Sequence, residues 1–90
     1  MSDTPAETLL EFPCEFPIKV FGLASDDFQA NVVAIVQRHA QLAPGDAIQR
    51  RQSQGGKYDA VTVTITATSK AQLDTIYQDL TASPIVVMAL

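Results

Sequence analysis

In the segment from residue 60 to residue 68, AVTVTITAT, apolar and hydroxyl side chains alternate strictly from Val61 onward. Successive side chains of a β-strand point to opposite faces of the sheet, so this period of two predicts a strand with one buried face. Val61, Val63 and Ile65 are expected to face a core, and the threonines between them to line the other face. The alternation therefore predicts a sheet that is covered on one side only.

The rest of the chain supplies three more predicted strands. Alternation indicates a first strand over residues 16–23, and a polar second strand follows at residues 47–54. The third strand, over residues 58–67, has the strongest pattern and is expected to be central. The apolar run at residues 85–90 ends the chain as the fourth strand.

Two helices separate these strands. Ser25 is the predicted N-cap of the first helix, with Asp26 and Asp27 in its first turn, and apolar residues at helical spacing continue to about residue 41. Ser69 opens the second helix, where the run SKAQ matches a capping box. The order of elements is therefore β-α-β-β-α-β.

This order predicts an α+β fold of the ferredoxin-like, split βαβ type. Right-handed crossovers place both helices on one face of a four-stranded antiparallel sheet and pair the fourth strand with the first. Residues 13–90 are expected to form this single domain, and residues 1–12 a tail that is mobile or loosely docked. An alternative is that Leu9, Leu10 and Phe12 dock on the open face and cover it.

Composition limits the setting and the partners. Ninety residues suffice for one domain, and no apolar run approaches the roughly 18 residues that cross a bilayer. The acidic N-terminal segment lacks the basic and apolar regions of a signal peptide, so we expect a cytoplasmic protein without a membrane partner. A net charge of −4 gives no long-range attraction to nucleic acid.

Four segments of the chain resemble the YbeD-like family of small bacterial proteins: EFPCEFPIKVFGLASDDF, VVAIVQRHA, GGKYDAVTVTITATSKAQLDTIYQDL and VVMAL. The resemblance covers residues 9–90 and implies a ferredoxin-like fold similar to the ACT-type regulatory domains. It implies no established activity, and a link to lipoate metabolism rests on gene neighbourhood alone. This chain lacks the family's basic residue before Gly56-Lys57-Tyr58 and has Ala60 where the family tends to have a small hydroxyl residue. Both departures weaken any anion-binding role of the hairpin.

The reactive residue types do not form a recognisable catalytic set. Cys14, the single cysteine, is expected to pack as a small apolar side chain, and His39, the single histidine, to pack at a helix end without metal-ligand company. Gly55-Gly56-Lys57 precedes a strand rather than a helix, so it predicts a hairpin turn and no phosphate loop. Arg50 and Arg51 point to opposite faces of a strand and suit a solvated sheet edge. We therefore expect no enzyme, no cofactor and no metal site.

RNA-recognition domains share the predicted topology and stack bases on aromatic side chains of the open face. Tyr58 stands at one such position, but Ala60 occupies the place of a second ring, and Phe21 is the one aromatic that the first strand adds. Nucleic acid is therefore not the expected partner. Weak RNA binding through the open face stays as the alternative function.

The fourth predicted strand is apolar on both of its sides, although helices cover only one face of the sheet. It is expected to lie beside Lys19 and Phe21 of the first strand, and grouped apolar side chains on an open face indicate an interaction site. The sequence thus predicts a non-enzymatic regulatory or binding module. Its open face, or the loop after the first strand, would engage a partner protein, a second copy in a weak homodimer, or a small metabolite. The candidate interaction surface consists of Phe21, Tyr58, Thr62, Thr64, Val86 and Met88.

Overall fold

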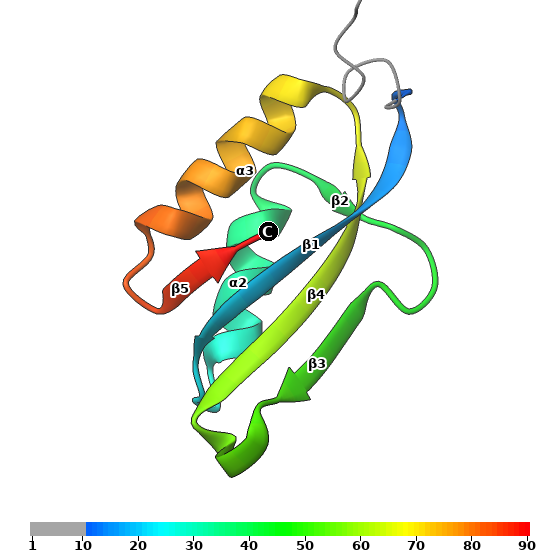
Figure 1. Cartoon of the computed structure of the whole chain (residues 1–90). Coiled ribbons are helices and arrows are strands. Elements are labelled where there is room, and N and C mark those ends of the chain that lie inside the picture. The colour runs from blue at the N-terminus through cyan, green and yellow to red at the C-terminus, as the bar shows by residue number, and fades with distance from the viewer. Residues whose placement is uncertain (1–10) are drawn as a thin grey trace, which may run out of the picture.

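The computed structural model describes residues 11–90, apart from the side chain of Gln54. Its strands and helices follow one another along the chain as Figure 1 shows. Their bounds are β1 Cys14–Leu23, α2 Phe28–Gln37, β2 Gln41–Leu42, β3 Ile48–Gln52, β4 Tyr58–Ala67, α3 Lys70–Ala82 and β5 Val86–Ala89, with a short 3-10 turn at Gln54–Gly56.

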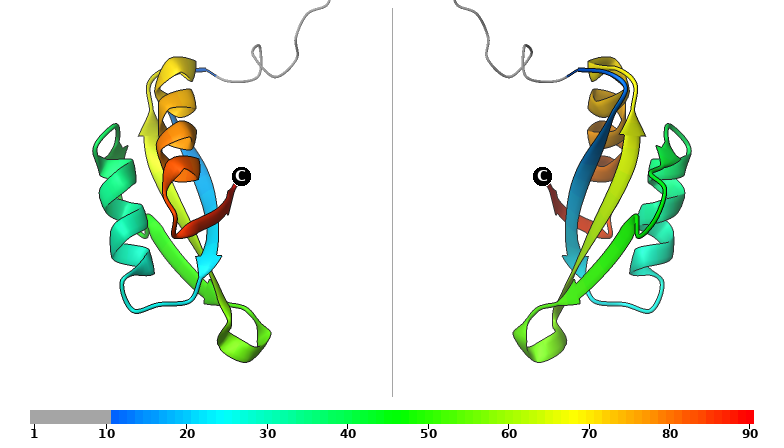
Figure 2. Two further views of the ribbon diagram at one scale, coloured as in Figure 1. Left: turned by 90° about the vertical axis from the view of Figure 1, so that its left-hand side faces the viewer. Right: turned by 90° about the vertical axis from the view of Figure 1, so that its right-hand side faces the viewer.

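The strands form one antiparallel sheet. Its strand order is β2-β4-β1-β5, and β3 pairs with β4 on the same edge as β2. Both helices pack on one face of this sheet and leave the other face open (Figure 2). The ferredoxin-like arrangement, the central position of residues 58–67 and the pairing of the last strand with the first are confirmed.

The sheet has five strands instead of the predicted four, because its edge strand is interrupted. The N–H of Ala43 donates to the carbonyl of Thr64, and the N–H of Thr64 donates to the carbonyl of Ala47, so β4 keeps its partners on both sides of the gap. Between these bonds the chain bulges outward at Pro44, which has no N–H to donate, and at Gly45, which has a φ of 87°. β2 was not predicted.

The first helix begins at Phe28 with Asp27 as its N-cap, so the predicted N-cap at Ser25 is wrong. The N–H of Ala24 still pairs with a backbone carbonyl of the turn before β4, at 2.9 Å, and this keeps the chain extended past β1. The ring of Phe28 then packs against Gly22, where an added Cβ would lie 2.3 Å from a ring atom. Residues 24–27 form the loop between β1 and α2, and this loop places the Phe28 ring over the sheet.

The second helix begins as predicted. Oγ of Ser69 accepts a hydrogen bond from the N–H of Gln72 at 3.1 Å, and the Gln72 side chain accepts one from the N–H of Thr68 at 2.7 Å. The amide of Gln72 also donates to the carbonyl of His39 at 2.8 Å. One side chain therefore caps α3 and ties it to the end of α2.

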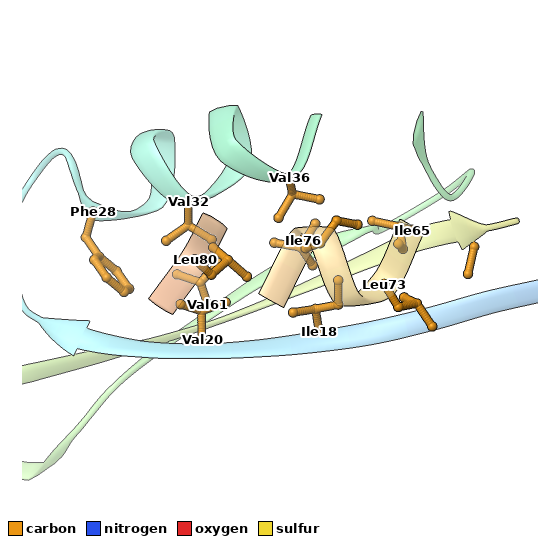
Figure 3. Close-up of a cluster of buried hydrophobic side chains, with 12 residues drawn as sticks. Ile18, Val20, Phe28, Val32, Val36, Val61, Ile65, Leu73, Ile76 and Leu80 are labelled. Carbon is orange, nitrogen blue, oxygen red and sulfur yellow. The ribbon is translucent and has the colours of Figure 1, made fainter. Parts of the chain in front are cut away.

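The core lies between the sheet and the two helices (Figure 3). Val61, Val63 and Ile65 are fully buried in it, and the threonines of β4 lie on the opposite face, so the predicted faces are confirmed. Cys14, like Phe12 before it, packs against this core. Residues 1–10, with Leu9 and Leu10, lie outside the described residues. The fully or nearly buried members from β1 and the helices are Ile18, Val20, Phe28, Val32, Val36, Leu73, Ile76 and Leu80.

Candidate functional site

The open face of the sheet is built from rows of side chains that run across the strands. Residues paired in an antiparallel sheet point to the same face, so the register defines each row. In one row Phe21 of β1 pairs with Ala60 of β4, which pairs with Arg51 of β3. In the next row Lys19 pairs with Thr62, which pairs with Gln49.

These two rows surround a hollow of about 380 Å³, which we call the open-face hollow. Its lining is Lys19, Phe21, Gln49, Arg50, Arg51, Ala60 and Thr62. Ala60 lies between Phe21 and Arg51 with only a methyl group, and the two longer side chains stand on either side of it. A smaller hollow of about 160 Å³ shares Phe21, Ala60 and Arg51 and extends towards Tyr58.

The open-face hollow is positively charged. Neither Lys19 nor Arg51 forms an ion pair with another side chain of residues 11–90. Glu15 is the acidic residue of β1 that shares their face, and it lies four residues from Lys19, or about 13 Å along a strand. The two cations are therefore available to an anionic ligand.

Arg50 and Arg51 point to opposite faces, as predicted, but their environments differ. Nη2 of Arg50 donates to Oδ2 of Asp59 at 2.6 Å on the helix-covered side, so the prediction of a solvated edge holds only for Arg51. The side chain of Asp59 is fully buried, and its role was not predicted. The signal was present, because Asp59 is in phase with the buried valines of β4.

The predicted interaction surface is assembled only in part. Phe21 and Met88 are paired neighbours on the open face, where Met88 is 48% exposed. The predicted position of Val86 on the same surface is wrong. The register between β1 and β5 shifts at Gly22, so Val86 lies opposite this glycine and packs against the core, while Val87 is 63% exposed.

The remaining predicted residues all lie on the open face of β4 but at different distances from the hollow. Thr62 lines it. Thr64 lies one row further along, opposite Pro17, and Tyr58 lies at the other end, opposite Leu23. Lys57 places its ammonium 5.6 Å from the centre of the Tyr58 ring, at the end of the sheet that carries the hairpin.

His39 has a partner that the sequence did not indicate. Its Nε2 lies 2.5 Å from Oδ2 of Asp79, which comes from the C-terminal part of α3. This pair and the Gln72 side chain join the two helices, so the geometry of His39 is that of a packing and linking residue. In residues 11–90 no three His, Cys, Asp or Glu side chains are grouped as metal ligands.

A model of the family described as "Protein of unknown function (DUF493)" matches residues 7–90. The chain belongs to this family. Its similarity to the YbeD-like group, first seen in the strand and hairpin segments, is thereby confirmed.

Relatives of known sequence agree in length and extent. A UPF0250 protein of Chromobacterium violaceum is 48% identical over 91 residues, with 100% of both chains covered. A UPF0250 protein of Shewanella sediminis is 45% identical over 83 residues, with 91% of each chain covered. Like the family model, these names state no activity.

The fold is shared with a solved structure of low sequence similarity. The solution structure of protein HP0495 from H. pylori is similar with a TM-score of 0.65 and 17% identity, over 100% of this chain and 98% of that one. No helix of residues 11–90 is both long enough and apolar enough to span a bilayer. This DUF493 member therefore shares its family with the UPF0250 proteins and its fold with HP0495, and these names state no activity.

Proposed function

We propose that this protein is a non-enzymatic regulatory module that binds a small metabolite on the open face of its sheet. The observation that carries the proposal is the open-face hollow, which has two cations without ionic partners in residues 11–90 and one aromatic side chain. Its volume of about 380 Å³ lies within the range of about 300–1,000 Å³ that is typical of small-molecule sites.

The lining of the open-face hollow suits binding better than catalysis. It offers ammonium and guanidinium groups, an amide and a hydroxyl, all of which hold a ligand in place. The most frequent general bases, the imidazole of histidine and the carboxylates of Asp and Glu, are not among the side chains that line it. The nearby carboxylate, on Asp59, is buried on the other side of the sheet and bonded to Arg50.

The test compares the metabolites that bind the wild-type protein with those that bind a variant whose hollow is filled by a larger side chain. Purified protein is incubated with a small-molecule extract of bacterial cells, and bound compounds are identified by mass spectrometry after rapid filtration. Ala60→Leu should abolish retention of the ligand, because the larger side chain occupies the space between Phe21 and Arg51. Thr64→Leu, on the same face of β4 but outside the hollow, is the matched control and should retain it.

A shared outcome for the two variants would contradict the proposal. If every compound that the wild-type protein retains is also retained by Ala60→Leu, or if the wild-type protein retains none, the hollow is not the binding site. Folding midpoints of both variants are measured first, so that a loss of retention is assigned to the hollow and not to unfolding.

A protein partner is the second candidate, and the apolar strip beside the hollow favours it. This strip consists of the exposed residues Val87, Met88 and Leu90, which lie beside β1. Grouped apolar side chains on the surface of a small protein are typical of an interaction site. The strip adjoins the hollow at Phe21, which pairs with Met88, so a partner seated on the strip would also contact a ligand in the hollow.

A further inference from the structure

The geometry points to a planar aromatic anion as the ligand of the open-face hollow, with its ring between Phe21 and Arg51 and its anionic group at Lys19. This inference rests on the proposed function of the hollow as a small-molecule site and adds the chemical class of the ligand. It is carried by three features of the hollow: the spacing of its walls, the position of its cations and the difference between its two ends.

The spacing of the walls suits one flat ring. Phe21 and Arg51 lie on β1 and β3, which both pair with β4, so their backbones are separated by two strand spacings, or about 9.5 Å. Ala60 between them leaves the space above the sheet unfilled. A ring in contact with the Phe21 ring on one side and the Arg51 guanidinium on the other needs about 7–8 Å between them. Guanidinium groups stack on aromatic faces, so both walls favour a flat, electron-rich ligand.

The cations select for negative charge. Lys19 lies two residues from Phe21 on the same face of β1, about 6.6 Å along the strand, and next to Thr62 and its hydroxyl. Asp59, the acidic residue of β4, is buried on the helix side and engaged by Arg50. Charge-assisted hydrogen bonds from Lys19, with the Thr62 hydroxyl beside it, would hold a carboxylate or a similar anionic group.

The two ends of the site differ in chemistry, which gives the ligand a direction. Lys19, Gln49 and Thr62 make the polar end. At the other end the smaller hollow continues from Phe21 and Ala60 to Tyr58, which is 39% exposed. An elongated ligand would thus place its anionic group at Lys19 and its far apolar edge at Tyr58. A spherical inorganic anion would leave the aromatic end empty.

Three probes separate shape from charge in titrations followed by the amide signals of ¹⁵N-labelled protein. The first is 2-naphthoate, which is planar and anionic. The second, 2-naphthalenemethanol, is planar but neutral, and the third, cyclohexanecarboxylate, is anionic but not planar. We expect saturable one-to-one binding of 2-naphthoate, with the largest shifts at Ala60 and Thr62, and about tenfold weaker binding of each of the other two probes.

Two variants test the walls. Arg51→Gln should weaken 2-naphthoate binding about tenfold, because it removes both the charge and the stacking plane. Ala60→Leu should abolish binding, and Thr64→Leu should leave it unchanged. Equal affinity for the three probes, no saturation by 2-naphthoate at millimolar concentration, or shifts centred away from the hollow would overturn the inference.

The failure of this inference is distinguishable from that of the proposed function. A metabolite whose retention depends on Ala60 but which is neutral or not planar would overturn the ligand class and leave the small-molecule site standing. A base of single-stranded RNA is the competing flat occupant. Micromolar, salt-sensitive binding of an oligouridine that Arg51→Gln removes would overturn the assignment to a small molecule.

Discussion

Arg50 and Asp59 form an ion pair on the helix-covered face of the sheet, with Nη2 of the arginine 2.6 Å from Oδ2 of the carboxylate. The Asp59 side chain has no exposed surface, whereas that of Arg50 is 35% exposed. Oδ1 of Asp59 has no hydrogen-bond partner in the part of the chain that the structure describes. The ion pair with Arg50 is therefore the interaction that offsets the desolvation penalty of the buried carboxylate.

Removing the arginine alone should be costly. Arg50→Met leaves a buried carboxylate without its cation, and we expect the free energy of unfolding to fall by about 2–4 kcal/mol, with the partial exposure of Arg50 moderating the effect. Arg51→Met, its neighbour on the open face, should change it by less than about 0.5 kcal/mol. Urea titrations of the two variants check this, and equal costs would show that the pair does not support the fold.

The two faces of β4 should respond differently to the loss of side-chain volume. Val63→Ala leaves a cavity in the core and should cost about 1–3 kcal/mol of unfolding free energy, because Val63 is fully buried between the sheet and the helices. Thr64→Ala, on the open face, should stay within about 0.5 kcal/mol. Denaturant titration measures both, and a Thr64 effect as large as that of Val63 would contradict the face assignment.

Tyr77 should make the protein less stable at high pH. Burial raises the pKa of the Tyr77 phenol above its ordinary value near 10, because the phenolate is poorly solvated inside the protein. Above pH 10 the unfolded chain releases this proton while the folded chain retains it, so the free energy of unfolding falls as pH rises towards the raised pKa. The comparison therefore needs a reference variant that lacks only this phenol.

That reference is Tyr77→Phe, which keeps the ring and removes the ionisable group. Urea midpoints at pH 9 and pH 11 should differ less for this variant than for the wild-type protein. An equal decline in the two proteins would show that the phenol of Tyr77 does not contribute to it.

The apolar strip should be a contact surface that the fold does not need. Val87→Ser combined with Met88→Ser removes exposed side chains, so we expect an unchanged folding midpoint. A photo-crosslinking residue at position 88 should capture a protein in cells, and one at position 78, on the exposed side of α3, should not. A sharp fall in the midpoint, with equal crosslinking at both positions, would make the strip a part of the core. Sedimentation of the purified protein separates a second copy from a different partner.

Generic RNA should bind weakly at physiological salt. The motivation is the net charge of −4 and the position of Ala60, which leaves a gap where a second stacking ring would lie on β4. Titration with mixed oligonucleotides at several salt concentrations tests this. A submicromolar affinity that falls steeply with salt would favour the RNA-binding alternative over the small-molecule site.

Local patterns in the sequence determined the central strand, its two faces and the start of α3. The alternation of residues 58–67 depends only on the geometry of a single extended chain, and the bond between Ser69 and Gln72 spans one helical turn. The family resemblance also came from sequence alone. Each of these features joins residues that are close in the chain, where side-chain type is enough to define the structure.

Tertiary structure decided the features that join distant segments. The packing of Phe28 on Gly22 fixed the start of α2, and the register shift beside this glycine turned Val86 towards the core. The open-face hollow likewise depends on register, because Lys19 and Arg51 come from strands that do not pair with each other and meet only across β4. A one-residue change in register would turn such a side chain to the other face, and strand composition alone does not specify the register.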